Sequence, residues 1–199
     1  MSDDLDEKDD SIKIVLLGEV ATGKTSLINV YFGLSFETEL QTTLTPSVSQ
    51  KGLQINGNSY QIHICDTAGQ EKYRAMTKIF IKGTQIVIFV YDVTEEFTFT
   101  ELDFWVKTVE EVLGKGPQLA VVGNKIDLVD KQVVDKEKGE EYANKIGAMF
   151  YETSAKEDSK GFQNFILQLT EEFINKKGYI KKSGEKLSKK EKKSKGCSC

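Results

Sequence analysis

A glycine-rich loop between an apolar strand and a helix is the feature that most constrains this fold. Residues 18–25 read GEVATGKT, directly after the apolar run 12–17 and at the start of a helical segment. In a loop of the form G-x-x-x-x-G-K-[ST] at a strand end, backbone N–H groups surround phosphates, the lysine neutralises the β and γ oxygens, and the hydroxyl meets Mg²⁺. We therefore predict a phosphate-binding loop made by Gly18, Val20, Ala21, Thr22, Gly23, Lys24, Thr25 and Ser26.

Short β-branched runs alternate with longer helical segments from residue 11 to about residue 175, which is typical of a parallel sheet with crossover helices. The turn Asn-Gly-Asn at 56–58 predicts a hairpin, so we place an antiparallel pair of strands at the sheet edge. The expected strands are 12–17, 49–55, 60–66, 85–92, 118–123 and 148–153. The expected helices are 24–32, 97–114, 133–146 and 161–177.

Three further polar segments follow apolar strands, where an open α/β sheet places its ligand. Asp66 begins DTAGQ and suits the Mg²⁺ shell. Residues 124–127 read NKID, and the carboxylate of Asp127 can accept hydrogen bonds from the N1–H and 2-amino groups of guanine, which adenine lacks. Residues 153–156 (TSAK) end the last strand. Each motif is weak alone, but four in this order indicate a guanine nucleotide site.

Charge is distributed unevenly along the chain. Residues 1–10 carry six acids and one lysine, whereas residues 176–199 carry ten lysines and two glutamates. We expect both segments to be disordered, and a basic tail on a mildly acidic body favours an anionic surface over a nucleic acid. The apolar run 86–91 is far short of the roughly 20 residues that span a bilayer, and the acidic start is no signal peptide. We expect a protein of the cytosol or nucleus.

The chain resembles the Ras-like small GTPases from residue 11 to about 175, and among them the Rab family, most closely its endocytic, early-endosomal subgroup. The resemblance rests on DTAGQE at 66–71, YDVT at 91–94, GNKIDL at 123–128 and ETSAK at 152–156, with GE at 18–19 and TTL at 42–44 pointing to the subgroup. It implies an α/β fold: a three-layer P-loop NTPase G domain over 11–176, with a mixed, mostly parallel six-stranded sheet and helices on both faces.

The resemblance also implies a role for each matching position. Thr43 would contact Mg²⁺ and the γ-phosphate from the first switch segment, and Phe36 would pack against the guanine. Gly69 would sense the γ-phosphate and Gln70 would orient the attacking water, in the second switch segment. The implied catalytic residues are Gln70, Lys24 and Thr43, and the implied metal-binding residues are Thr25, Thr43 and Asp66. The implied base site comprises Asn124, Lys125, Asp127, Ser154, Ala155 and Lys156, with the Ala155 N–H offered to the base oxygen.

The sequence departs from the family pattern at three positions that bear on function. Val20 stands where glycine or serine is common, and its β-branched side chain would crowd the space that Gln70 and an arginine finger must enter, which predicts slow hydrolysis. Cys65 and Val48 replace aromatic residues of the usual effector surface. Two alternatives stay open: a binding module that holds GTP with negligible hydrolysis, and a P-loop ATPase or nucleoside kinase, which Asp127 disfavours.

The C-terminus Cys197-Ser198-Cys199 resembles the doubly prenylated C-x-C ending of Rab proteins, so we expect residues 177–199 to be a disordered basic tail with a prenylation site. The implied partners are a guanine nucleotide, GTP or GDP with Mg²⁺, a membrane, an exchange factor, an activating protein, a dissociation inhibitor and effectors. We expect a monomer without a nucleic-acid partner. It would act in vesicle trafficking at the cytoplasmic face of endosomal or vesicular membranes and cycle with the cytosol.

Overall fold

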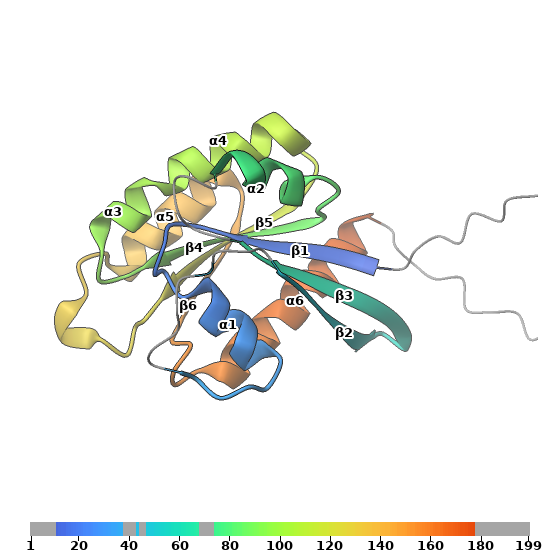
Figure 1. Ribbon diagram of the computed structural model, residues 1–199, viewed down its shortest axis with the longest axis horizontal. Coiled ribbons are helices and arrows are strands. Elements are labelled where there is room, and N and C mark those ends of the chain that lie inside the picture. The colour runs from blue at the N-terminus through green and yellow to red at the C-terminus, as the bar shows by residue number, and fades with distance from the viewer. Residues whose placement is uncertain (1–10, 38–42, 44–46, 68–73, 178–199) are drawn as a thin grey trace, which may run out of the picture.

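A computed structural model describes residues 11–37, 43, 47–67 and 74–177, and its centre is one six-stranded sheet (Figure 1). The strand order is β2-β3-β1-β4-β5-β6, and every neighbouring pair is parallel except β2 and β3. The expected mixed, mostly parallel sheet with an antiparallel hairpin at its edge is thereby confirmed. The strands are β1 (Ser11–Leu17), β2 (Ser47–Ile55), β3 (Asn58–Asp66), β4 (Ile86–Asp92), β5 (Gln118–Asn124) and β6 (Met149–Thr153).

Helices cover both faces of the sheet, as the three-layer prediction requires (Figure 1). The helices are α1 (Lys24–Tyr31), α2 (Arg74–Ile81), α3 (Glu96–Thr100), α4 (Leu102–Leu113), α5 (Lys136–Ile146) and α6 (Ser159–Lys177), with a 3-10 turn at Val129–Lys131. Alternating strand residues divide the core into two parts. One packs under α1 and α6 and contains Ile14 and Phe162, and the other packs under α4 and α5 and contains Val15 and Trp105.

The helix predictions need three corrections, and hydrogen bonds give a local cause for two of them. Helix α2 was not expected. The expected helix 97–114 is divided at Glu101, whose carbonyl accepts from the Phe104 N–H at 3.1 Å in a turn tighter than an α-helix. Helix α5 begins at Lys136 and not at residue 133, because Val133 and Val134 both donate their N–H to the Val93 carbonyl and Asp135 caps the helix through Lys138 N.

The two positions that depart from the usual aromatic surface have different environments. Val48 on edge strand β2 is 52% exposed, so it lies on the surface. Cys65 is 1% exposed and packs in the core beside Val15 and Leu17, because β3 is covered there on both faces. A change at Cys65 therefore alters core packing beneath the surface.

Gly139, inside helix α5, is buried against the sheet at a point where a side chain has no room. A Cβ at this position would lie 2.5 Å from the Tyr91 hydroxyl and 2.6 Å from the Phe150 ring. We predict that Gly139→Ala lowers the free energy of unfolding by about 1 kcal/mol, because the clash exceeds the gain of about 1 kcal/mol in helix propensity. Urea unfolding measures the change, and Glu141→Ala, at an exposed position of the same helix, is the control. A Gly139→Ala protein more stable than its parent would contradict this packing.

Candidate nucleotide site

A cavity of about 530 Å³ opens where the carboxyl ends of the parallel strands meet. It is lined by the loop after β1, the start of α1, the segment around Phe36 and Thr43, and the loops after β3, β5 and β6. The lining residues are Val20, Ala21, Gly23, Lys24, Thr25, Ser26, Phe36, Glu37, Thr43, Thr67, Asn124, Lys125, Asp127, Leu128, Ala155 and Lys156.

Most of the predicted site residues lie on this cavity. Thr22, Asp66 and Ser154 are buried just behind the lining residues and bond to them. Three lining residues were not predicted: Glu37, Thr67 and Leu128. Thr67 directly follows the predicted residue Asp66, and Leu128 directly follows Asp127, so their place in the sequence could have identified them. Gly69, Gln70, Cys197 and Cys199 lie outside the described residues.

The two motif glycines of the loop after β1 are fixed by close contacts. A Cβ on Gly18 would lie 2.1 Å from the Val90 carbonyl oxygen, and a Cβ on Gly23 would lie 2.2 Å from Asn124 Nδ2. Both residues also have positive φ angles, 150° and 91°, which L side chains rarely adopt. The spacing G-x-x-x-x-G is therefore a steric requirement of how this loop packs on β4 and β5.

Lys24 places a buried ammonium at the floor of the cavity. Its Nζ donates to the carbonyl oxygens of Gly18 at 2.8 Å and Glu19 at 2.7 Å. Burial lowers the pKa of Lys24 to about 8, and the carboxylates of Asp66 and Glu19 partly offset this effect. Among the described residues this ammonium donates hydrogen bonds only to neutral carbonyls, so it can still bind an anion, and a phosphate would supply that charge.

Three oxygen-bearing side chains meet beside Lys24. Thr25 Oγ1 lies 2.7 Å from Thr43 Oγ1 and donates to Asp66 Oδ2 at 2.8 Å. The other carboxylate oxygen, Asp66 Oδ1, is buried without a hydrogen-bond partner among the described atoms, and burial raises the pKa of Asp66. Hydroxyl and carboxylate oxygens are the donors that Mg²⁺ prefers, and an unpaired buried carboxylate oxygen fits a cation. The predicted metal residues Thr25, Thr43 and Asp66 are thus brought together.

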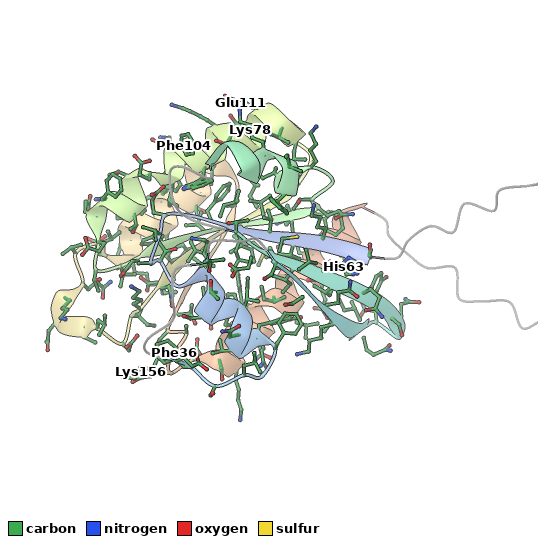
Figure 2. All side chains as sticks on the ribbon, in the orientation of Figure 1. Phe36, His63, Lys78, Phe104, Glu111 and Lys156 are labelled. Atoms are coloured by element: carbon green, nitrogen blue, oxygen red, sulfur yellow. The ribbon has the colours of Figure 1, made fainter. Side chains whose placement is uncertain are left out.

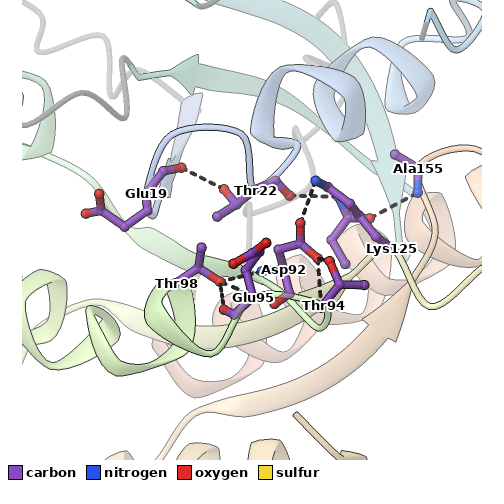
Figure 3. A network of polar contacts seen from close by, with 9 residues as sticks. Glu19, Thr22, Asp92, Thr94, Glu95, Thr98, Lys125 and Ala155 are labelled. Atoms are coloured by element: carbon purple, nitrogen blue, oxygen red, sulfur yellow. Dashed lines mark hydrogen bonds and ion pairs between the residues drawn. The ribbon is translucent and has the colours of Figure 1, made fainter. Parts of the chain in front are cut away.

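Asn124, the last residue of β5, bonds to two other loops through Thr22 and Ala155, which Figure 3 labels. Its Nδ2 donates to the Thr22 carbonyl at 2.9 Å, and its Oδ1 accepts from the Ala155 N–H at 3.1 Å. The neighbouring Lys125 has a positive φ of 71°, and its Nζ lies 2.5 Å from Asp92 Oδ2. Asp92 Oδ1 in turn accepts from the N–H and hydroxyl of Thr94. The NKID segment is therefore anchored to the loop after β1, to the end of β4 and to the loop after β6.

Asp127 lies at the cavity with its carboxylate oriented by one hydroxyl. Ser154 Oγ donates to Asp127 Oδ1 at 2.7 Å, which leaves Oδ2 and the remaining lone pairs available for a ligand. Phe36, which is 37% exposed, and Lys156 also line the cavity, and Figure 2 labels both. A carboxylate and an aromatic ring that line the same cavity suit a flat base that carries two hydrogen-bond donors.

The order of these groups across the cavity matches a nucleoside polyphosphate. Lys24, Thr25 and Asp66 lie at the ends of β1 and β3, whereas Asp127 and Ser154 follow β5 and β6, and β4 separates these two halves of the sheet. Val20, which is 40% exposed, also lines the cavity. The chain therefore supplies charge for phosphates at one end and hydrogen-bond acceptors for a base at the other.

Comparison with known proteins agrees with this geometry. The model of the Ras family matches residues 13–175. The chain is 42% identical over 162 residues to the Ras-related protein Rab-21 of Geodia cydonium, an alignment that covers 81% of this chain and 70% of the relative. It is 37% identical over 171 residues to the Ras-related protein Rab-21 of Dictyostelium discoideum, covering 85% and 80%. It is 39% identical over 150 residues to the Ras-related protein SEC4 of Saccharomyces cerevisiae, covering 75% and 69%.

We predict that Asp127→Asn weakens GTP binding about 100-fold, because the amide loses charge-assisted bonds to the base that are together worth about 3 kcal/mol. An amide can instead donate to a 2-oxo group, so xanthosine triphosphate should compete for the variant. Competition with a fluorescent nucleotide measures both effects, and Asp130→Asn, at an exposed residue three positions on, is the control. Unchanged GTP affinity together with no xanthosine binding would remove Asp127 from the base site.

Proposed function

The chain belongs to the Ras family of small GTPases and, within it, to the Rab proteins, and on that premise we propose that it is a membrane-attached GTP/GDP switch of vesicle trafficking. As a member of this family it binds guanine nucleotides and hydrolyses GTP. The observation that carries the proposal is the bond from Ser154 to Asp127, opposite the cluster of Lys24, Thr25 and Asp66. A protein that must discriminate guanine and respond to the γ-phosphate needs a base-binding group at one end of the cavity and a phosphate-binding group at the other.

We assign Asp127 to the N1–H and 2-amino groups of guanine, with Phe36 and Lys125 beside the ring. Lys24 and the backbone N–H groups of the loop after β1 bind the phosphates. Gln70 orients the attacking water, and Thr43 and Gly69 respond to the γ-phosphate, so that loss of this group releases both switch segments. That release is the signal that effectors read.

Mg²⁺ would be held by the oxygens of Thr25 and Thr43, with Asp66 behind them. The unpaired Asp66 Oδ1 and the contact of 2.7 Å between the two hydroxyls support this assignment. When bound, the cation neutralises charge on the β and γ oxygens during phosphoryl transfer. The chain itself supplies the orientation: the Asp66 carboxylate fixes the Thr25 hydroxyl, and Thr25 fixes Thr43.

Val20 sets the rate of hydrolysis in this proposal. Its branched side chain is 40% exposed on the cavity, where it competes for the space that Gln70 and an incoming arginine finger would occupy. Hydrolysis is therefore slow. In the stronger form of the same idea, hydrolysis is negligible and the protein holds GTP until exchange and membrane cycling remove it.

We predict that Val20→Ser speeds single-turnover GTP cleavage about tenfold. The smaller side chain leaves room for Gln70 to orient the attacking water, which lowers the activation free energy by about 1.4 kcal/mol. The measurement follows γ-labelled GTP on Mg²⁺-loaded protein, with ATP as the specificity control. Val30→Ala, a buried valine of α1 outside the cavity, controls for general loosening of the fold. Equal rates in the parent and Val20→Ser would show that Val20 does not limit hydrolysis.

The proposed chain organisation is an acidic N-terminus (1–10), a G domain (11–176) and a basic tail (177–199). Among the described residues, no helix has the length and apolar character that crossing a bilayer requires. Attachment would instead come from lipid chains on Cys197 and Cys199, assisted by the lysines of the tail, since two chains anchor stably where one is marginal. The attached protein would lie on the cytoplasmic face of endosomal or vesicular membranes and cycle through the cytosol as a monomer.

In cells, we predict that replacing Cys197 and Cys199 together by serine moves the protein from the membrane pellet to the soluble fraction. Each single substitution should give a partial shift, because one lipid chain supports reversible binding only. Cys65→Ala, a buried thiol, is the matched cysteine control. A double variant that pellets like its parent would reject lipid attachment at these residues.

A further inference from the structure

The loop between β6 and α6, residues 154–158, is held at both ends by one carboxylate. Asp158 Oδ2 accepts from the Tyr151 hydroxyl at 2.8 Å and from the Thr153 hydroxyl at 3.2 Å, both on β6. Asp158 Oδ1 accepts from the Gly161 N–H at 3.1 Å in the first turn of α6. The carboxylate thus bridges the strand before the loop and the helix after it.

Gly161 leaves the room that this carboxylate needs. A Cβ at this position would lie 2.2 Å from Asp158 Oδ1 and 2.3 Å from the Tyr151 hydroxyl. The Tyr151 hydroxyl is committed as a donor, and burial together with its bond to Asp158 raises the pKa of Tyr151 to about 12. Three residues outside the nucleotide cavity therefore form one closely packed cluster.

The hydrogen bonds between residues of this loop all end on Ser154, and the Ala155 N–H bonds outside the loop to Asn124 Oδ1. Its carbonyl accepts from the N–H groups of Glu157 at 3.2 Å and Asp158 at 2.8 Å. Its hydroxyl accepts from the N–H groups of Lys156 and Glu157 and donates to Asp127 Oδ1 at 2.7 Å. The position of the Ser154 hydroxyl, and with it the direction of the Asp127 carboxylate, depends on how residues 154–158 are held.

We propose that Asp158 is a positioning residue for base selectivity: by bridging β6 and α6 it holds Ser154 against Asp127. This setting favours guanine over hypoxanthine, the purine that has the same 6-oxo group but lacks the 2-amino group. The inference rests on the proposed role of Asp127. Tyr151, Asp158 and Gly161 lie outside the nucleotide motifs, and the inference gives this cluster a role in base specificity.

The test compares dissociation constants for GDP and inosine diphosphate. One bond from the 2-amino group to a carboxylate corresponds to a preference for GDP of about tenfold or more in the parent. We expect Asp158→Ala to reduce that preference to about threefold or less, chiefly by weakening GDP. A substitution that only lowered stability would weaken both ligands equally, so the ratio separates positioning from folding.

Glu157→Ala is the matched control, because it removes an exposed carboxylate at the adjacent position and keeps the backbone N–H groups. Asp158→Asn, the conservative change, should retain part of the preference. If Asp158→Ala does not fold, Gly161→Ala and Tyr151→Phe test the inference instead, the first by displacing the Asp158 carboxylate and the second by removing one of its hydrogen-bond donors.

A parent that binds neither ligand more tightly than ADP would overturn the proposed function itself. A guanine-selective parent whose GDP preference is unchanged in all these variants would overturn only the inference.

Discussion

The side-chain amide of Asn124 is the contact on which the site depends. It is 1% exposed, donates to the Thr22 carbonyl and accepts from the Ala155 N–H, so a single group holds the phosphate-binding loop against the base-binding loop. Gly23 has to be a glycine because Asn124 Nδ2 would lie 2.2 Å from any Cβ there. The two loops are thereby held together by one short, buried amide.

Around that amide, the parallel sheet brings the strand ends to one edge, and the helices bury both faces of the sheet. Strands β1, β3, β5 and β6 each end in a segment that lines the cavity, so residues far apart in the sequence meet without long connections. Burial then tunes the chemistry: it lowers the pKa of Lys24 and raises the pKa of Asp66. Both shifts disfavour the charged form, and a phosphate with a cation would reverse both at once. The cavity is therefore electrostatically suited to a ligand that carries both charges.

Sequence reasoning located the motifs because each follows a recognisable apolar strand, and it placed the antiparallel hairpin at the sheet edge because of its Asn-Gly-Asn turn. It could not locate the partners that hold the motifs. Asp92 and Asp158 lie outside the nucleotide motifs, and their contacts with Lys125 and Tyr151 exist only after β4, β5 and β6 are side by side. The sequence did not predict α2. It predicted that α5 begins at residue 133, because the hydrogen bonds from Val133 and Val134 to Val93 join two separate loops and leave no local pattern in the sequence. Periodicity placed Cys65 on the correct strand but gave no information on how far the covering helices extend.

The most direct measurement is the identity of the nucleotide that accompanies the protein. The full-length chain is purified in Mg²⁺ without added nucleotide and denatured, and the released small molecules are separated and quantified by chromatography. The account predicts close to one equivalent of guanine nucleotide per chain and no adenine nucleotide. Recovery of adenine nucleotide would contradict the assignment of the base site. Recovery of no nucleotide, from protein that also fails to take up added GDP, would contradict the account as a whole.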